Sequence, residues 1–290
     1  MVESEELRFD VNGHVIAALA YGDPDAPVVL GLHGWLDNAA TFNQLAPLLK
    51  GVRFIALDLM GHGYSDHRPP SMPYYIWDNV VDVVAVADEL GLEELHLLGH
   101  SMGASIASLL AGAFPERVQR VWLIEGVAPL VYEAEQLPTL MAEAINKRGK
   151  LKAKKLRPYA HLDDAVKARV NGRFPVSEQA ARWLVSRGMV RGGDGLYWRN
   201  DPSLVLPSIL RMSEDQVQSF LRKITAQVDL ILGKDGLDLD ALDERSACIR
   251  HLETHYFPGN HHLHLESEAA ALIAPLINNY FEEMLESDQV

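Results

Sequence analysis

Short, almost wholly apolar runs alternate with segments of helical spacing through the first 125 residues of this chain. The apolar runs are residues 27–32, 52–59, 94–99 and 118–125. The segments with helical spacing are residues 41–50, 76–90 and 101–114. Apolar runs of this length are typical of strands buried on both faces. Their alternation with helices predicts an α/β fold with a mostly parallel central sheet flanked by helices.

The alternation stops at residue 126 and resumes near residue 213. Between these positions the pattern indicates only helices and loops, and residues 141–200 hold fourteen Lys and Arg against five Asp and Glu. The segment after residue 212 begins with a predicted helix that has a capping box at Ser213 and Gln216. The pattern then predicts a strand at 228–232, a helix from about 238, a strand at 251–257 and a long C-terminal helix. We therefore expect a core domain from residues 1–125 and 213–290, and a helical insertion at 126–212.

The N-terminal hairpin and the cellular compartment can be predicted from local pattern and composition. Residues 6–20 alternate around Asn12-Gly13, which predicts a β-hairpin ahead of the sheet. The net charge of −14 argues against a nucleic-acid partner. The start, MVESEELRFD, lacks the features of a signal peptide, and no run is long and apolar enough for a membrane span. With Cys248 as the single cysteine, we expect a cytoplasmic protein; the sequence gives no indication of oligomeric state.

The stretch LLGHSMGAS (97–105) contains the pattern G-x-S-x-G between a predicted strand and a predicted helix. That context is the one in which the pattern forms a nucleophile elbow, a tight turn that exposes a serine above the sheet. The amide of Met102 then lies at a helix N-terminus, where negative charge is favoured. We predict Ser101 as a nucleophile.

A nucleophilic serine needs a base, and twelve histidines compete for that role. The stretch FPGNHHLHLE (257–266) follows the last predicted strand, at the carboxyl edge of the sheet where open α/β folds gather their sites. Its three histidines lack the helical i, i+4 pair and the nearby cysteines of common zinc motifs, so no metal is predicted. His62 and His67 belong to an earlier loop and are interpreted as structural.

The stretch GLHGW (31–35) ends another predicted strand. A loop at that place can supply a second backbone amide to an oxyanion hole, beside the amide of Met102. We predict that this second amide belongs to Trp35.

Taken together, HGW, DLMGHGYSD, GHSMG and PGNHH resemble the motifs of the α/β-hydrolase superfamily in their order and spacing, and HGWLDNAATFNQLAPLL is similar to its serine hydrolase-like family. The resemblance implies that residues 126–212 form a cap, or lid. It also implies that the catalytic histidine is His261, five residues before Glu266, with His262 as the second choice. Asn260 stands where the family commonly has glycine.

The third catalytic group, a carboxylate, has more than one candidate in the sequence. The superfamily usually places it three residues after the glycine that ends the strand at 228–232, and that position holds Gly236, between Asp235 and Asp238. The haloalkane dehalogenases are similar in having glycine there, and their acid lies at the end of the preceding core strand. Glu125 occupies that place, so it is preferred over the two aspartates. A carboxylate buried there needs a partner, and an imidazolium is one.

These residues predict a serine hydrolase that cleaves carboxylic esters through an acyl-enzyme, with a small-molecule ester or acyl compound as substrate. Two alternatives stay open. One is a carbon–carbon bond hydrolase or perhydrolase that uses the same residues, and the other is a ligand receptor that keeps the fold without turnover. No cofactor is predicted, because the phosphate-loop and dinucleotide glycine patterns are missing from the sequence.

Overall fold

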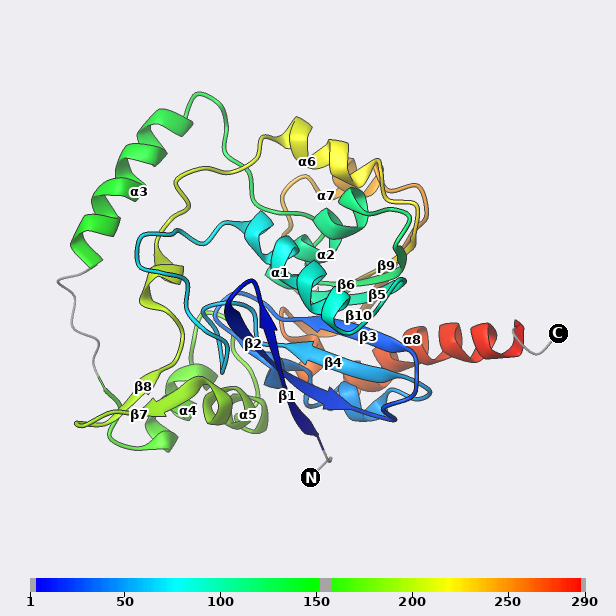
Figure 1. Ribbon diagram of the computed structural model, residues 1–290, viewed down its shortest axis with the longest axis horizontal. Helices are drawn as coiled ribbons and strands as arrows, with labels where there is room; N and C mark the ends of the chain where they lie inside the picture. The colour runs from blue at the N-terminus through cyan, green and yellow to red at the C-terminus, as the bar shows by residue number, and fades with distance from the viewer. Residues whose placement is uncertain (1–3, 152–157, 288–290) are drawn as a thin grey trace.

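The computed structural model describes residues 4–151 and 158–287, and its centre is a twisted eight-stranded sheet (Figure 1). The strand order is β1-β2-β4-β3-β5-β6-β9-β10. Strand β2 runs antiparallel to β1 and β4, and every other neighbouring pair is parallel. The strands are β1 Glu5–Val11, β2 His14–Tyr21, β3 Val28–Leu32, β4 Arg53–Leu57, β5 Leu95–His100, β6 Val118–Ile124, β9 Gln227–Asp235 and β10 Leu252–Asn260. The predicted mostly parallel sheet is confirmed.

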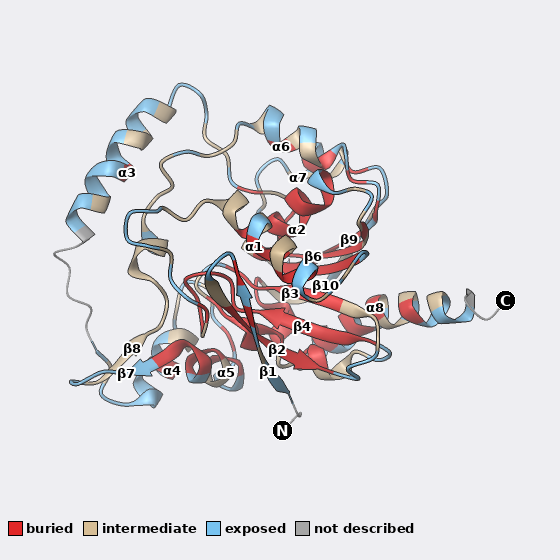
Figure 2. Ribbon diagram, viewed as in Figure 1, coloured by how far each residue is buried: buried red, intermediate tan, exposed pale blue. Residues whose placement is uncertain are grey.

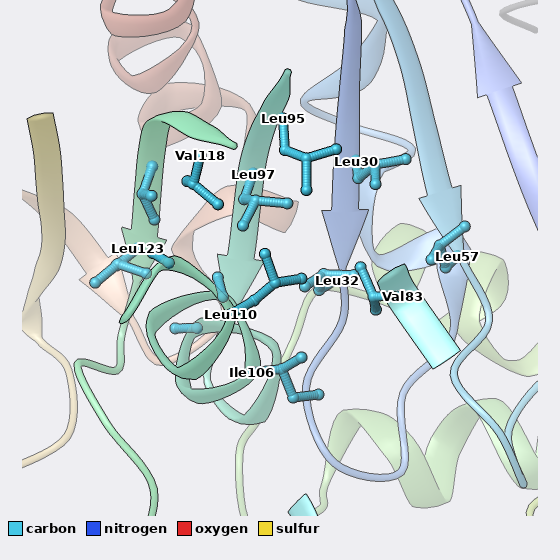
Figure 3. Close-up of a cluster of buried hydrophobic side chains, with 14 of the residues drawn as sticks. Leu30, Leu32, Leu57, Val83, Leu95, Leu97, Ile106, Leu110, Val118 and Leu123 are labelled. Carbon is cyan, nitrogen blue, oxygen red and sulfur yellow. The ribbon is translucent and has the colours of Figure 1, made fainter. Parts of the chain in front are cut away.

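One face of the sheet is covered by α1 (Ile76–Glu89), α2 (Met102–Ala113) and α6 (Glu214–Leu221). Figure 3 shows Ile106 and Leu110 of α2 in one cluster with Leu97 of β5 and Leu123 of β6, two neighbouring strands near the middle of the sheet. All four side chains are fully buried. Burying each leucine or isoleucine side chain contributes roughly 1.5–3 kcal/mol, so this layer fixes α2, the helix that follows Ser101, onto the sheet.

The other face is covered by α8 (Ser267–Ser287) and by two short 3₁₀ helices, Ala39–Phe42 and Ala46–Leu48. Trp122 of β6, Phe42 and Phe281 of α8 are among the largest fully buried side chains of this layer. Figure 2 shows the inner strands, such as β4, β5 and β6, buried between the two layers, while the outer faces of the helices are exposed. Helix spacing at 41–50 had predicted one continuous helix; instead Pro47, which has no amide hydrogen to donate, lies in the second 3₁₀ helix.

The segment between β6 and α6 contains α3 (Leu137–Leu151), α4 (Leu162–Val170) and α5 (Glu178–Gly188). It also contains a small antiparallel pair, β7 (Met189–Arg191) with β8 (Leu196–Trp198). The expectation of helices and loops alone is therefore wrong for this pair. Three-residue strands are too short to show an alternating pattern of apolar and polar residues. The glycine-rich turn between them is the one sequence feature that indicates a hairpin there. Residues 152–157, part of the predicted insertion, lie outside the described residues.

Helix α5 is attached to the core by buried polar contacts. The guanidinium of Arg187, at the end of α5, donates to both carboxylate oxygens of Asp58 at 3.0 and 2.8 Å, and it also pairs with Glu6 of β1. The side chain of Asp58 is fully buried. Asn38 adds a hydrogen bond to the carbonyl of Leu184, also in α5, at 2.9 Å. Helix α5 is therefore held against the sheet edge, whereas α3 stands off from the body (Figure 1).

Two further elements complete the core. Helix α7 (Leu242–Ser246) is shorter and starts later than the helix expected from about residue 238, and β10 extends three residues beyond the predicted strand, to Asn260. Two more 3₁₀ helices, Pro202–Val205 and Leu263–Leu265, lie near the carboxyl edge. Within the described ranges, no helix combines the length and apolar character needed to cross a membrane.

Candidate active site

Ser101 occupies the sharp turn between β5 and α2. Its backbone has φ 54° and ψ −111°, a conformation that L-residues rarely adopt and that costs on the order of 1–3 kcal/mol. The amide of Ser101 donates to the carbonyl of Ile124 at 2.8 Å, and its own carbonyl accepts from the amide of Ser105 at 3.1 Å. These bonds hold the strained turn at the carboxyl edge of the sheet, as the G-x-S-x-G pattern predicts.

Gly103 has a steric role in this turn. A Cβ at residue 103 would lie 2.0 Å from the carbonyl oxygen of Leu32, the last residue of β3. Only glycine lets the first turn of α2 approach β3 so closely. This approach brings the first amide of α2, that of Met102, next to the loop that follows β3. Amides in the first turn of a helix have no acceptor within the helix, so they are free for a ligand.

The loop after β3, residues 33–38, is called the β3 loop here. Two buried histidines hold it against the loop after β4. Nε2 of His33 accepts a hydrogen bond from the amide of Leu59 at 3.0 Å, and Nε2 of His62 accepts from the amide of Leu36 at 3.2 Å. Burial lowers the pKa of His33 to about 4 and that of His62 to about 3, so both rings are neutral near pH 7. These bonds brace the loop that carries Trp35.

Glu125 directly follows β6, and its carboxylate lies beside His261. Oε2 of Glu125 is 3.2 Å from Nδ1 of His261. The same carboxylate accepts hydrogen bonds from the amide of Gly233 at 2.7 Å and from the amide of Leu237 at 2.8 Å. Burial raises the pKa of Glu125, but the hydrogen bonds from His261 and the two amides outweigh it and leave the pKa below its usual value. The carboxylate is therefore ionised and aimed at one imidazole.

Gly236 makes room for this carboxylate. A Cβ at residue 236 would lie 2.1 Å from Oε1 of Glu125. The neighbouring Asp235 and Asp238 are both exposed to solvent. The structure thus brings Glu125 to His261 and leaves the two alternative carboxylates at the surface.

Residues 260–265, here called the histidine loop, run from the last residue of β10 to the end of the 3₁₀ helix Leu263–Leu265. Its first histidine is linked to the serine turn through His100, whose Nε2–H donates to the carbonyl of His261 at 2.8 Å. The ring of His264 lies 4.3 Å from the ring of His100, centroid to centroid, and Nε2 of His264 is 2.9 Å from the hydroxyl oxygen of Thr41. Burial holds the pKa of His100 and of His264 well below the usual histidine value, so these neutral rings are packing elements.

His262, the second choice for the base, is engaged elsewhere. Its Nε2 lies 2.9 Å from Oδ2 of Asp37, and because a carboxylate can only accept, Nε2 carries the proton and donates. Nη2 of Arg169, from the last turn of α4, donates to Oδ1 of Asp37 at 3.2 Å and lies 3.0 Å from the same His262 nitrogen. Burial raises the pKa of Asp37, but His262 and Arg169 outweigh it and hold that pKa well below its usual range. His262 therefore belongs to a buried polar group that includes a side chain from α4.

Asn260 replaces the glycine common in the family, and the structure gives it two contacts. Its Oδ1 accepts from the amide of His262 at 2.9 Å, and its Nδ2 donates to the carbonyl of Pro175 at 3.1 Å. Glu266, directly after the histidine loop, makes a second link to the segment between α4 and α5, because it accepts from the amide of Ser177 at 3.0 Å. That segment is thus bonded to the histidine loop and to the residue that follows it.

Among the described residues, two groups could hold a metal ion: Asp37 with His100 and His262, and Asp229 with Glu253 and His255. In the first group, the guanidinium of Arg169 already supplies the positive charge beside the carboxylate. The donor set therefore does not favour a divalent cation, which would have to displace this arginine. In the second group, Asp229 is paired with Arg120 in the same way.

A cavity of about 560 Å³ lies above Ser101, His261 and His262. Its wall consists mainly of aromatic and aliphatic side chains from the β3 loop and from the segment between β6 and α6. These are Trp35, Leu36, Tyr159, Ala168, Phe174, Leu184, Tyr197, Trp198, Pro202 and Val205. Trp35 and Val205 are 49% and 54% exposed, so they lie where the cavity opens to solvent. The site is thus a strained serine and a carboxylate-paired histidine under an apolar chamber.

Sequence reasoning missed three residues of this site: Asp37, Arg169 and Phe174. Asp37 lies two residues after Trp35, and the short spacing could have drawn attention to it. Arg169 and Phe174 come from the insertion, where nothing in the sequence separates them from the other basic and apolar residues. Their place depends on tertiary contacts: α4 packs on α5, and Arg169 bonds to Asp37 of the core.

Known proteins resemble this chain in both sequence and structure. The model of the family described as alpha/beta hydrolase fold matches residues 27–268. A serine hydrolase-like protein of Dictyostelium discoideum is 32% identical, over 96% of this chain and 82% of its own length. The crystal structure of a hypothetical protein from Pseudomonas aeruginosa is 40% identical with a TM-score of 0.91, covering 96% of this chain and 99% of that one. A thioesterase domain from the curacin biosynthetic pathway is 26% identical with a TM-score of 0.84, over 96% and 99%.

Proposed function

Since this chain belongs to the α/β-hydrolase fold family and resembles its serine hydrolase-like members, we propose that it hydrolyses carboxylic esters through an acyl-enzyme. The observation that carries the proposal is the pairing of Nδ1 of His261 with the buried carboxylate of Glu125, beside a serine held at φ 54°. A histidine oriented in this way can take a proton on its other nitrogen, which is what a serine nucleophile requires.

The proposed reaction has two halves. Ser101 Oγ attacks the carbonyl carbon of the ester while His261 takes the hydroxyl proton, and Glu125 stabilises the imidazolium that forms. The negative charge on the carbonyl oxygen is stabilised by the amides of Met102 and Trp35. His261 then gives the proton to the departing alcohol. In the second half, water repeats the attack on the acyl-enzyme, with His261 again as base, and releases the carboxylic acid and Ser101.

The cavity supports a substrate with an apolar acyl or alcohol part. A chamber of about 560 Å³ with an aromatic wall suits a small-molecule ester, and its volume is within the range typical of ligand pockets. We assign the role of a cap to residues 126–212, because Tyr159, Phe174 and Trp198 from this segment line the chamber. The single free cysteine, Cys248, supports a reducing compartment such as the cytoplasm as the place of this reaction.

Thioesters are a second substrate class to test. They react through the same acyl-enzyme, and the likeness to the curacin thioesterase domain, at 26% identity, favours including them. Carbon–carbon bond cleavage and perhydrolysis would use the same residues, and a ligand receptor would use none of them catalytically.

The experiment that tests the proposal is a rapid-mixing assay with a p-nitrophenyl ester and with the corresponding acyl thioester. The proposed mechanism predicts a burst of released p-nitrophenol that is stoichiometric with enzyme, when deacylation is slower than acylation. The Ser101→Ala variant should show neither burst nor turnover while keeping the wild-type circular dichroism. Full turnover by a folded Ser101→Ala protein would rule the assignment out, and a wild-type protein that turns over no ester or thioester would favour the receptor.

A further inference from the structure

Three separate parts of the molecule meet at the side chain of Arg169, in the last turn of α4. Its Nη2 donates to Asp37 of the β3 loop and touches His262 of the histidine loop. Its Nη1 donates to the carbonyl of Phe174, in the connection to α5, at 2.7 Å. One guanidinium therefore fixes the relative positions of two loops that belong to the core and one that belongs to the insertion.

Each of these partners is adjacent to a residue of the proposed reaction. Asp37 is two residues from Trp35, whose amide is assigned to the oxyanion hole, and His262 is bonded directly to His261 in the chain. The ring of Phe174 lies 4.7 Å from the ring of His261, centroid to centroid. A change in the position of Arg169 would thus displace the β3 loop through Asp37, and His261 through His262 and Phe174.

The pair of Arg169 with Asp37 is largely shielded from water, with side chains 16% and 7% exposed. Removing one member of such a pair leaves the other charge uncompensated, and the loop that carries it then rearranges or takes up water. Rigid support of this kind matters for catalysis because reacting groups must be held close to the productive geometry.

We propose that Arg169 is a positioning residue, which acts through Asp37 and His262 to hold the β3 loop and His261 in the arrangement needed for acyl transfer. The inference rests on the proposed function, since it assumes that Ser101 and His261 react. It extends that function by making catalysis depend on one cap side chain that does not itself exchange a proton with the substrate.

The competing role for an arginine that lines the cavity is to bind an anionic part of the substrate. The two roles predict different kinetics. A positioning residue affects kcat with neutral substrates, whereas a substrate-binding residue affects KM with anionic substrates and leaves neutral ones untouched. The two nitrogens Nη1 and Nη2 already donate to Phe174 and Asp37, which favours positioning.

The experiment compares Arg169→Met and Arg169→Lys with Arg182→Met. Arg182 is a matched control, because it lies in the same insertion and pairs with Asp163 and Glu178, but its side chain is 42% exposed. Two readouts are used: the rate at which a fluorophosphonate labels Ser101, and kcat and KM for a neutral p-nitrophenyl ester. Arg169→Met should lower the labelling rate and kcat by roughly tenfold to hundredfold, the effect expected from a displacement of about 1 Å, with little change in KM.

Arg169→Lys should recover part of the loss, because it restores the charge but not the fork of donors, and Arg182→Met should match the wild type. Unchanged labelling of a folded Arg169→Met protein would overturn the inference. A defect confined to KM for an anionic ester would overturn it too, in favour of substrate binding. If the wild type itself is not labelled at Ser101, the proposed function fails and the inference with it.

A second variant tests the same inference if Arg169→Met does not fold. Asp37→Asn is nearly isosteric and removes the negative charge that both Arg169 and His262 contact. It should reduce the labelling rate and kcat in the same direction, with a fold-change no larger than that of a folded Arg169 variant. A folded Asp37→Asn protein with wild-type kcat and labelling rate would also contradict the inference.

Discussion

The carboxylate of Glu125 fills the space that a side chain at Gly236 would take. A Cβ at residue 236 would lie 2.1 Å from Oε1 of Glu125, so an acid at one position excludes a side chain at the other. Glu125 and a side chain at residue 236, where the resemblance would place an acid, therefore compete for one volume. This relationship makes the location of the acid open to direct experiment.

Glu125→Gln is expected to lower kcat by roughly 10²–10⁴-fold, because the imidazolium of His261 loses its charged partner while the volume stays nearly constant. Steady-state kinetics with a p-nitrophenyl ester measure the effect. The control is Asp235→Asn, at an exposed carboxylate next to Gly236, which should retain wild-type kcat. Equal losses in the two variants would contradict the assignment of Glu125.

Moving the acid should be possible. In a Glu125→Gly background, the substitution Gly236→Asp has room for its side chain, and glycine also suits the φ of 53° at residue 125. We expect the double variant to regain at least roughly tenfold in kcat over Glu125→Gly alone. Gly236→Asp in the wild-type background should instead lose both activity and thermal stability, because its Cβ collides with the carboxylate. Activity that is no higher in the double variant than in Glu125→Gly would contradict the expectation that an acid at residue 236 can serve His261.

Gly103→Ala is expected to destabilise the protein by roughly 1–3 kcal/mol or more, since the new Cβ would lie 2.0 Å from the carbonyl oxygen of Leu32 and neither backbone can move freely. Turnover should fall as the serine turn shifts. Denaturant unfolding and ester kinetics measure the two effects. The matched control is Gly149→Ala in α3, where a Cβ meets nothing within 4 Å. The control should be neutral or slightly stabilising, by up to about 1 kcal/mol.

Stability is expected to fall as the pH drops below about 6.5, because His33 and His62 are held neutral in the folded protein. Burial lowers their pKa values to about 4 and about 3, so between those values and about 6.5 the unfolded chain binds protons that the folded chain does not. Burial also lowers the pKa values of His96, His100, His262 and His264, which act in the same direction. Denaturant midpoints measured from pH 7 to pH 5 should therefore decrease.

The variant His62→Gln isolates one contribution to this pH dependence. Glutamine cannot titrate, so the slope of unfolding free energy against pH should become shallower by up to about 1.4 kcal/mol per pH unit. The wild type measured over the same pH range is the reference for this slope. An identical slope in His62→Gln and wild type would show that His62 does not remain neutral on folding.

The sequence predicted the parts of this protein that depend on local pattern. Family and fold are confirmed by the match over residues 27–268 and by the mostly parallel sheet. The contact between Glu125 and His261 was also anticipated, because a glycine at 236 removes the usual acid and a strand end at 124 offers another. The assignment of the catalytic roles remains a prediction.

Other features could not be predicted because they depend on tertiary packing. The group formed by Asp37, Arg169 and His262 joins positions more than ninety residues apart on three segments, and no periodicity links them. The β7–β8 pair has strands of three residues, below the length at which alternation is visible. The helix expected at 41–50 divided into two 3₁₀ helices because the apolar spacing does not account for Pro47.

The buried pair of Arg187 with Asp58 has a consequence for cooperativity of unfolding. Because α5 carries the cation that neutralises a fully buried carboxylate of the core, neither part reaches its native electrostatic balance without the other. The insertion and the sheet should therefore melt in a single transition, as one thermodynamic unit. A chain cut down to the sheet alone, or given a foreign lid in exchange, would have to replace Asp58 as well.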